Sequence, residues 1–188
     1  LSLHDALPIS ATNPAVKAVL VHPGTYVPNS HRQALVFLNR SHRGVQLIGL
    51  GRPILSAANP RIADRSSRSF PAVVNHVIYL GDGLAANTVV SGFRLTGANN
   101  FVTNSAQAEL EPDQSWRKGR FYYGDGGAIK IYHRSYPVLR HLEIIDNYAS
   151  PCAGGISIQH EGATNSYALI ENCVFRNNRA EVTGAALD

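Results

Sequence analysis

The feature that most constrains the fold of this chain is an internal repeat. Three segments align: "VVSGFRLTGANN" from Val89, "VLRHLEIIDNYA" from Val138 and "LIENCVFRNNRA" from Leu169. In each segment an apolar residue precedes a two-residue break, and two apolar residues at alternate positions follow the break. The apolar positions are, in order, Val90, Phe93 and Leu95; Leu139, Leu142 and Ile144; and Ile170, Cys173 and Phe175. The breaks end in residues that tolerate turns, namely Gly92, His141 and Asn172.

A second element interleaves with the first. "GGAIKIYH" from Gly126 matches "GGISIQH" from Gly154, and a third copy begins at "TGAALD". The joint period is about thirty residues, which is the range of stacked repeat proteins. Each period holds short segments of alternating pattern between Gly or Asn turns, and no helical period lies between them.

These repeats predict an all-β chain built as a right-handed parallel β-helix solenoid, truncated at both ends. A crossover helix needs about a dozen residues between parallel strands, and the repeats leave no room for one. Each strand should therefore pair with its counterpart one repeat later, about 4.8 Å away, with right-handed connections. Alternate residues then point into the stack, the apolar positions above together with Ile129, Ile131, Ile156 and Ile158. The residues at the intervening positions of these strands point outward: Lys130, Tyr132, Ser157 and Gln159.

The domain organisation follows from the same pattern. Residues 10–188 should form one domain, with loop insertions near residues 59–75 and 100–124. Leu1–Ile9 resembles the translation of the end of a common sequencing adapter, so we exclude this segment from the fold prediction. The alternative is a genuine irregular N-terminal arm.

The repeats also carry a resemblance to known families. "GGAI" at Gly126–Ile129 and "CVFRNN" at Cys173–Asn178 resemble the GGAI and FxxN repeats of polymorphic outer-membrane proteins. "VHPGTYVP" at Val21–Pro28 resembles the first coil of pectin-lyase-like proteins. The resemblance implies a secreted β-helix and covers lyases, galacturonidases, phage tailspikes and adhesins. It transfers no catalytic residue, because no active-site motif is matched and the later copies depart from the pattern.

The charge and composition of the chain limit the classes of partner that it is expected to bind. Charge is sparse, the net charge is +4, and fourteen of the 17 basic residues are arginines. The positive charge is scattered, so no nucleic-acid partner is expected, and an anionic polysaccharide or a solvated surface explains it equally well. No apolar run is long enough to cross a membrane. Cys152 and Cys173 lack metal-ligand spacing and predict either one disulfide or two buried thiols. The oligomeric state is left open.

The acidic residues give two candidate sites. Asp82 and Asp125 occur in "GDG" and Asp146 ends a predicted strand, so these carboxylates could act as acid and base, although "GDG" is also ordinary turn sequence. Glu109, Glu111 and Asp113 could bind Ca²⁺ or form a solvated acidic loop. The spacing of these three acidic residues matches no defined metal loop. The catalytic residues stay unknown. No metal or cofactor is expected, and Ca²⁺ is admitted only if the protein is a lyase.

Polar residues at equivalent repeat positions have structural explanations. His133 and His160 should stack at a strand end, where two histidines could bind a metal, but no third ligand is evident. Asn147 and Asn178 should also stack, and asparagine side chains at such corners hydrogen-bond the backbone of neighbouring repeats.

A sugar-binding surface is predicted from the aromatic and basic residues of the second insertion and the adjoining outward strand positions. Aromatic rings stack on sugars and guanidinium groups bind carboxylates in bidentate fashion. The alternative is that the aromatic residues cover the side of the stack as a local core. The candidate ligand-binding residues are Trp116, Arg117, Arg120, Tyr122, Tyr123, Lys130 and Tyr132.

The sequence therefore predicts a secreted or surface-exposed bacterial β-helix module that binds polysaccharide or serves as a structural, adhesin-like stalk. The alternative is a polysaccharide lyase or glycoside hydrolase of the same fold. An enzyme should place at least two candidate groups within reach of one sugar in an open groove, among Asp82, Asp125, Asp146, Lys130 and Arg140.

Overall fold

The computed structural model of the protein describes residues 12–13, 17–101, 120–160 and 165–188. Strands dominate the described residues, and the short helical segments η1 (Arg40–His42) and α3 (Arg120–Gly124) interrupt them. The paired strands of each sheet run parallel, from the first pair of β1 and β4 to the last pair of β13 and β17. The chain is thus all-β with parallel strands, as the repeats predict.

The strands follow one another in five sets, each of which we call a rung. The first three rungs are β1 (Ala18–Val21), β2 (Thr25–Tyr26) and β3 (Arg32–Leu38); β4 (Gln46–Gly49), β5 (Ile54–Ser56) and β6 (Val74–Leu80); and β7 (Val89–Ser91), β8 (Arg94–Thr96), β9 (Asn99–Phe101) and β10 (Ile129–Tyr132). The last two are β11 (Val138–Arg140), β12 (Glu143–Ile145), β13 (Tyr148–Ser150) and β14 (Ile156–Gln159); and β15 (Leu169–Glu171), β16 (Val174–Arg176) and β17 (Arg179–Ala180).

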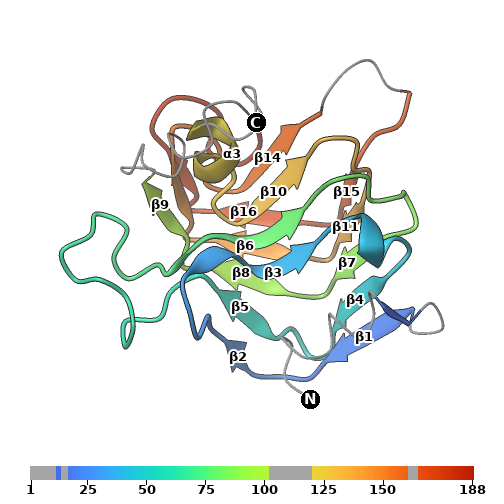
Figure 1. The fold of residues 1–188 in the computed structure, drawn as a ribbon, viewed down its shortest axis with the longest axis horizontal. Coiled ribbons are helices and arrows are strands. Elements are labelled where there is room, and N and C mark those ends of the chain that lie inside the picture. Colours follow the sequence, from blue (N-terminus) through green and yellow to red (C-terminus); the bar gives the residue numbers. More distant parts are fainter. Residues whose placement is uncertain (1–11, 14–16, 102–119, 161–164) are drawn as a thin grey trace.

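Each sheet collects the equivalent strands of successive rungs (Figure 1). The four sheets have the strand orders β1-β4-β7-β11-β15, β2-β5-β8-β12-β16, β3-β6-β10-β14 and β9-β13-β17. The third copy of the second repeat element pairs in the same way, because Leu187 forms a parallel bridge with Ile156. Every repeat unit recognised in the sequence therefore lies directly beside its neighbour.

The predicted register is confirmed residue by residue. Leu139 pairs with Val90 on one side and Ile170 on the other, and Ile129 pairs with Ile156. The predicted inward residues join one apolar core that runs through all rungs, with Ile158, Ile170, Cys173 and Phe175 partly buried against it. Since a slip of one residue would turn every side chain to the opposite face, the alternating pattern fixes this register.

The corners between sheets explain the break residues. Gly92, His141 and Asn172 all have positive φ, at 82°, 53° and 52°, and so adopt the left-handed conformation that the turn requires. The double glycines have a different cause. A Cβ atom at Gly127 would lie 2.7 Å from the carbonyl oxygens of Gly154 and Tyr148, so only glycine lets the neighbouring rungs approach this closely.

The two predicted insertions have different outcomes. Residues 59–73 leave the stack between β5 and β6 and project to one side (Figure 1), while Ala72 returns to pair with Ala58. The second insertion falls mostly on residues 102–119, which lie outside the described residues, as does Leu1–Ile9. In the described ranges, no helix has the length and apolar character needed to cross a membrane.

Candidate functional site: a groove along three stacked strands

The candidate site begins at the corner between β12 and β13 and its equivalents in the neighbouring rungs. Gly97, Asp146 and Asn177 occupy this corner in successive rungs and have φ values of 74°, 56° and 55°. Asparagine, aspartate and glycine are the residues that adopt this conformation at least cost. The corner therefore presents an exposed carboxylate and an exposed amide, one rung apart.

Buried asparagines hold the corner in place from inside. The Asn147 side chain donates hydrogen bonds to the carbonyls of Leu95 (3.1 Å) and Ile145 (3.0 Å) and accepts one from the Ala98 N–H (3.2 Å). Its amide also donates to Oδ1 of Asn178 (3.1 Å), one rung later. The two asparagines form the predicted ladder, which satisfies backbone groups across rungs and makes the corner rigid.

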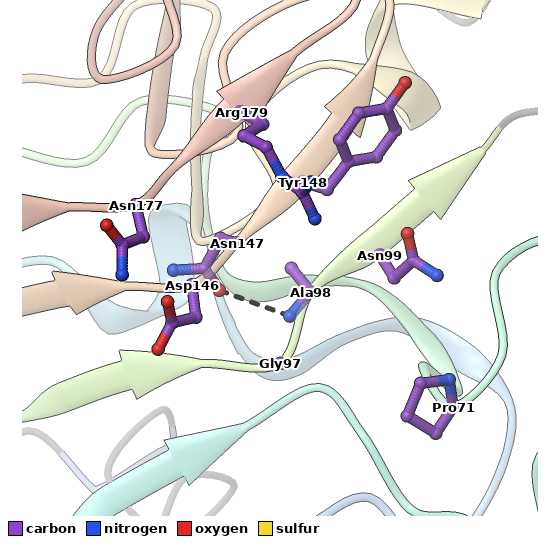
Figure 2. A pocket seen from close by; sticks show the side chains of 9 residues that line it. All are labelled: Pro71, Gly97, Ala98, Asn99, Asp146, Asn147, Tyr148, Asn177 and Arg179. Atoms are coloured by element: carbon purple, nitrogen blue, oxygen red, sulfur yellow. Dashed lines mark hydrogen bonds between the residues drawn. The ribbon is translucent and has the colours of Figure 1, made fainter.

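The outer surface beyond the corner carries one column of polar and aromatic side chains. Asn99, Tyr148 and Arg179 are direct partners in the parallel pairing of β9, β13 and β17. Figure 2 shows these three side chains projecting from adjacent strands, beside the corner residues. Neighbouring strands lie about 4.8 Å apart, so the column repeats hydrogen-bonding groups at that interval along the stack.

The projecting segment 59–73 supplies one wall of this surface. The Asn99 amide donates to the carbonyls of Arg68 (3.0 Å) and Phe70 (2.9 Å). The Arg68 guanidinium lies 4.3 Å from the centre of the Phe101 ring, and this ring lies 4.6 Å from that of Tyr148. The wall is thus fixed to the sheet by hydrogen bonds and a cation–π contact, and the Phe101–Tyr148 pair lies within the sheet beside it.

Together these elements enclose an open groove of about 480 Å³. Its lining residues are Pro71, Gly97, Ala98, Asn99, Asp146, Asn147, Tyr148, Asn177 and Arg179 (Figure 2). The Asn177 amide, the Asp146 carboxylate, the Arg179 guanidinium and the phenol ring of Tyr148 border a single ligand-sized space. This is the inventory that binds a hydroxyl-rich molecule through hydrogen bonds and ring stacking. We call this outer side of β9-β13-β17 the open face.

The outer side of β3-β6-β10-β14 is built differently, and we call it the closed face. Tyr79, Lys130 and Ser157 form one outward column, and all three are buried. The helix α3 covers this column. Tyr122 of α3 packs edge-on against Tyr79 (5.8 Å) and Tyr132 (4.7 Å).

Amide side chains tie α3 to the stack. Asn75 donates to the carbonyl of Tyr123 (3.1 Å), and Asn100 donates to the carbonyl of Gly124 (3.0 Å). The aromatic residues of α3 thus contribute to a second core, formed by Ala34, Tyr79, Tyr122, Tyr123 and Tyr132.

One expectation about the outward residues of this sheet is wrong. Lys130 and Tyr132 point away from the main core, as their parity predicts, but they do not form a solvent face because α3 and its tyrosines lie over them. The Lys130 ammonium donates to Oε1 of Gln159 (3.0 Å) and Oγ of Ser157 (3.3 Å). Burial lowers the pKa of Lys130 to about 8, although the carboxylates of Asp125 and Asp188 favour its charged form.

One group of potential metal ligands lies beside Lys130. The carboxylates of Asp125 and Asp188 and the thiol of Cys152 lie within 4.8 Å of one another. Burial raises the pKa of Asp125 and that of Cys152. The Lys130 ammonium already supplies positive charge here, and a thiol is not a ligand that Ca²⁺ uses, so the group does not fit the Ca²⁺ site of a lyase.

The histidines have structural surroundings. His76 of β6 is fully buried, its Nδ1 lies 2.8 Å from the Gly126 carbonyl oxygen, and burial followed by the Lys130 charge lowers its pKa to about 3. His160 contacts the carbonyl of Ser135 (2.9 Å) through Nε2 and the ring of Tyr136. His133 contacts the Tyr132 ring instead. The predicted stacking ladder of His133 and His160 therefore brings no shared metal site.

The sequence-predicted ligand-binding residues divide into two groups. Trp116 and Arg117 lie outside the described residues, and only the backbone of Arg120 is described. Tyr122, Tyr123, Lys130 and Tyr132 come together on the closed face, where they are buried. Their role as ligand-binding residues stays a prediction. Cys152 and Cys173 are free thiols, which resolves the alternative of a disulfide.

The candidate catalytic groups do not converge. Asp146 lines the groove, Asp82 accepts a hydrogen bond from Tyr79 (3.3 Å), and Arg140 pairs with Glu171 (3.3 Å) on another sheet. Asp125 and Lys130 are buried together. The acidic candidates Glu109, Glu111 and Asp113 lie outside the described residues.

Sequence reasoning missed the groove as a unit, although the signal was present. In the aligned repeats "TGANN", "DNYA" and "NNRA", the second residue after the corner is Asn99, Tyr148 or Arg179. Reading that column as one outward row would have found the open face. The wall from residues 59–73 has no repeat partner, so no alignment could place it.

Comparison with known proteins leaves the chain without an assigned relative: no family model matches it, and neither a curated protein nor a solved structure is similar to it.

Proposed function

We propose that this chain forms a right-handed parallel β-helix, of the kind found in pectin-lyase-like proteins, and binds a polysaccharide on its open face. Four parallel sheets that each collect one strand from successive rungs support the β-helix. The hand is the one that parallel crossover connections overwhelmingly adopt. With such a ligand, we propose that the module is secreted or exposed on the cell surface.

The observation that carries the proposal is the groove along β9, β13 and β17. It joins exposed polar groups at the corner, Asp146 and Asn177, to the outward column that contains Tyr148 and Arg179. Because each rung contributes one side chain to the column, the column offers contacts at regular intervals to a chain that itself repeats. A polysaccharide has that property, and each sugar residue supplies hydroxyl groups for the amides and an apolar ring face for the tyrosine.

The distribution of charged groups favours binding over glycoside hydrolysis. Of the five candidate groups for acid–base chemistry, only Asp146 lines the groove. A glycosidase needs a second carboxyl group across the scissile bond, and a lyase needs a base together with a cation at the sugar acid. No described lining residue other than Asp146 supplies a carboxylate, whereas Asp146 and Arg179 together supply a base and a cation, so a lyase is the second candidate function.

A glycan array tests the proposal. The full chain should retain a defined set of polysaccharides. Arg179→Ala should weaken that retention about tenfold, the effect of one lost charge-assisted hydrogen bond, and Asn177→Gly about fivefold, the effect of one lost neutral hydrogen bond. Glycine at position 177 removes the amide while keeping the left-handed backbone. Val138→Ala, an outward change on β11, is the matched control and should change nothing.

Two results would count against polysaccharide binding. If no polysaccharide is retained, the structural, adhesin-like alternative gains support. If the groove variants and the Val138→Ala control bind equally well, the groove is not the site.

A further inference from the structure

A second surface lies around the corner from the groove, on the outer side of β2-β5-β8-β12-β16. Three arginines gather there about one carboxylate. Arg94 donates to Oε2 of Glu143 through Nε and lies 2.7 Å from it, and Arg52 pairs with Oε1 of the same carboxylate. Arg176 lies on the same outer side, because it pairs with Ile145 of β12, two residues after Glu143. The hydrogen bond from Arg94 and the charges of the three arginines hold the pKa of Glu143 below its usual value.

The cluster carries an excess of positive charge that faces solvent. Two guanidinium groups, those of Arg52 and Arg94, contact the Glu143 carboxylate, and Arg176 is exposed on the same outer side, so the positive charges of the cluster outnumber its one negative charge. The Arg52 side chain is 58% exposed and that of Arg94 is 42% exposed, whereas that of Glu143 is only 17% exposed. Guanidinium donors that Glu143 does not use are therefore directed to solvent, where an oxyanion can accept them.

The charges are distributed along the stack and do not converge on one point. Arg52 precedes β5 in the second rung, Arg94 begins β8 in the third, and Arg176 ends β16 in the fifth. At about 4.8 Å per rung, the row extends over about 14 Å. A row of this length fits a linear polymer with several acidic groups better than it fits one small anion.

We propose that Arg52, Arg94 and Arg176 form a binding surface for a sulfated or phosphorylated polysaccharide, separate from the groove. The surface is the flat outer side of a sheet, and no helix or β-ribbon projects from its described strands to enter the major groove of duplex DNA. Glu143 aligns the arginines and occupies part of their hydrogen-bonding capacity, so it limits the affinity for the polymer.

The test measures binding of the full chain to dextran sulfate by titration calorimetry. Arg94→Ala should weaken binding about tenfold, since it removes a charge-assisted contact. Arg140→Ala is the matched control, because it removes the same charge from the neighbouring sheet, where Arg140 pairs with Glu171. That control should bind within about twofold of the parent. Glu143→Gln should bind more tightly than the parent, because it releases two guanidinium groups without removing any.

A further variant tests the proposal independently of whether Arg94→Ala folds. Arg94→Lys preserves the charge but not the fork of donors and should give an intermediate affinity, which protects the test if Arg94→Ala misfolds. Equal losses in Arg94→Ala and Arg140→Ala, or weaker binding by Glu143→Gln, would overturn the proposal in favour of a net-charge effect.

Competitors separate the ligand classes. Polyphosphate should displace dextran sulfate, and the carboxylated polymer alginate should do so less well if the ester oxyanion is recognised. Displacement by duplex DNA at equal charge concentration would overturn the assignment to a polysaccharide. Asn177→Gly, the groove variant, should leave dextran sulfate binding unchanged, so this surface and the groove can fail independently.

Discussion

The closed and open faces are outer sides of neighbouring sheets in the same stack, yet their environments are opposite. On the closed face the outward residues Tyr79 and Lys130 are fully buried beneath α3. On the open face the outward column of Tyr148 and Arg179 borders a groove. The alternating pattern is equivalent in both, so the difference comes from the segments inserted between strands. One insertion covers a face, and the other, residues 59–73, stands beside a face and forms a wall.

This comparison teaches that outward parity in a stacked-strand protein does not mean exposure. A buried outer face becomes a second core, with its own aromatic cluster and its own desolvated charges. Its residues then contribute to stability and respond to pH, whereas residues of an uncovered face are free to bind ligands.

The largest expected effect concerns His76, which lies at the edge of the closed face and whose pKa is lowered to about 3. Between pH 6.5 and 3 the unfolded chain takes up a proton at His76 that the folded chain does not. Folding stability should therefore fall by about 5 kcal/mol as the pH decreases through this range. Chemical denaturation of the parent and of His76→Gln at several pH values isolates this contribution, because other groups cancel in the difference. Parallel curves for the two proteins would show that His76 is not buried in its neutral form.

A comparison of tyrosines tests the two faces directly. Tyr79→Ala should destabilise the protein by about 3–5 kcal/mol, because it removes a fully buried ring that stacks on Phe37 (4.4 Å). Tyr148→Ala should cost about 1 kcal/mol, since its ring is only partly buried and its loss leaves little cavity. Urea denaturation of both variants gives the two free energies. Equal costs would mean that the faces do not differ in burial.

A smaller pH effect than that of His76 concerns Lys130 at alkaline pH. Its pKa in the folded state is about 8, below the usual 10.5, so the unfolded chain binds more protons between these values. Stability should therefore rise with pH from 8 to 10.5, by about 3 kcal/mol relative to Lys130→Met. If the parent and the variant show the same pH dependence, the ammonium is solvated and the closed face is open.

The repeats made most of the scaffold predictable. The pairing of Leu139 with Val90 and Ile170 could be read from the alignment because a one-residue slip would invert the faces. The left-handed corner at His141 and Asn172 followed from the residues that tolerate turns. The strands and corners that belong to the repeats can therefore be placed from the sequence alone.

The repeats could not predict which outer face of the stack is covered and which is exposed. The helix α3 and the wall at Pro71 each occur once, so no repeat reports where they pack. Tyr122 of α3 belongs to no strand repeat, yet it packs against Tyr79 and Tyr132 on the face that contains Lys130. The alignment of the repeats contains the outward column of the groove but not its wall, so only the column could be predicted from the sequence.

The most direct test of the account is an NMR titration that follows backbone amide shifts while an oligosaccharide retained on the array is added. The account predicts that the amides of Asn99, Tyr148 and Arg179 shift together and saturate, while those of Lys130 and Tyr132 stay unchanged. Shifts that concentrate at Tyr122, Lys130 and Tyr132 would contradict it, because they would place ligand binding on the face that we describe as closed.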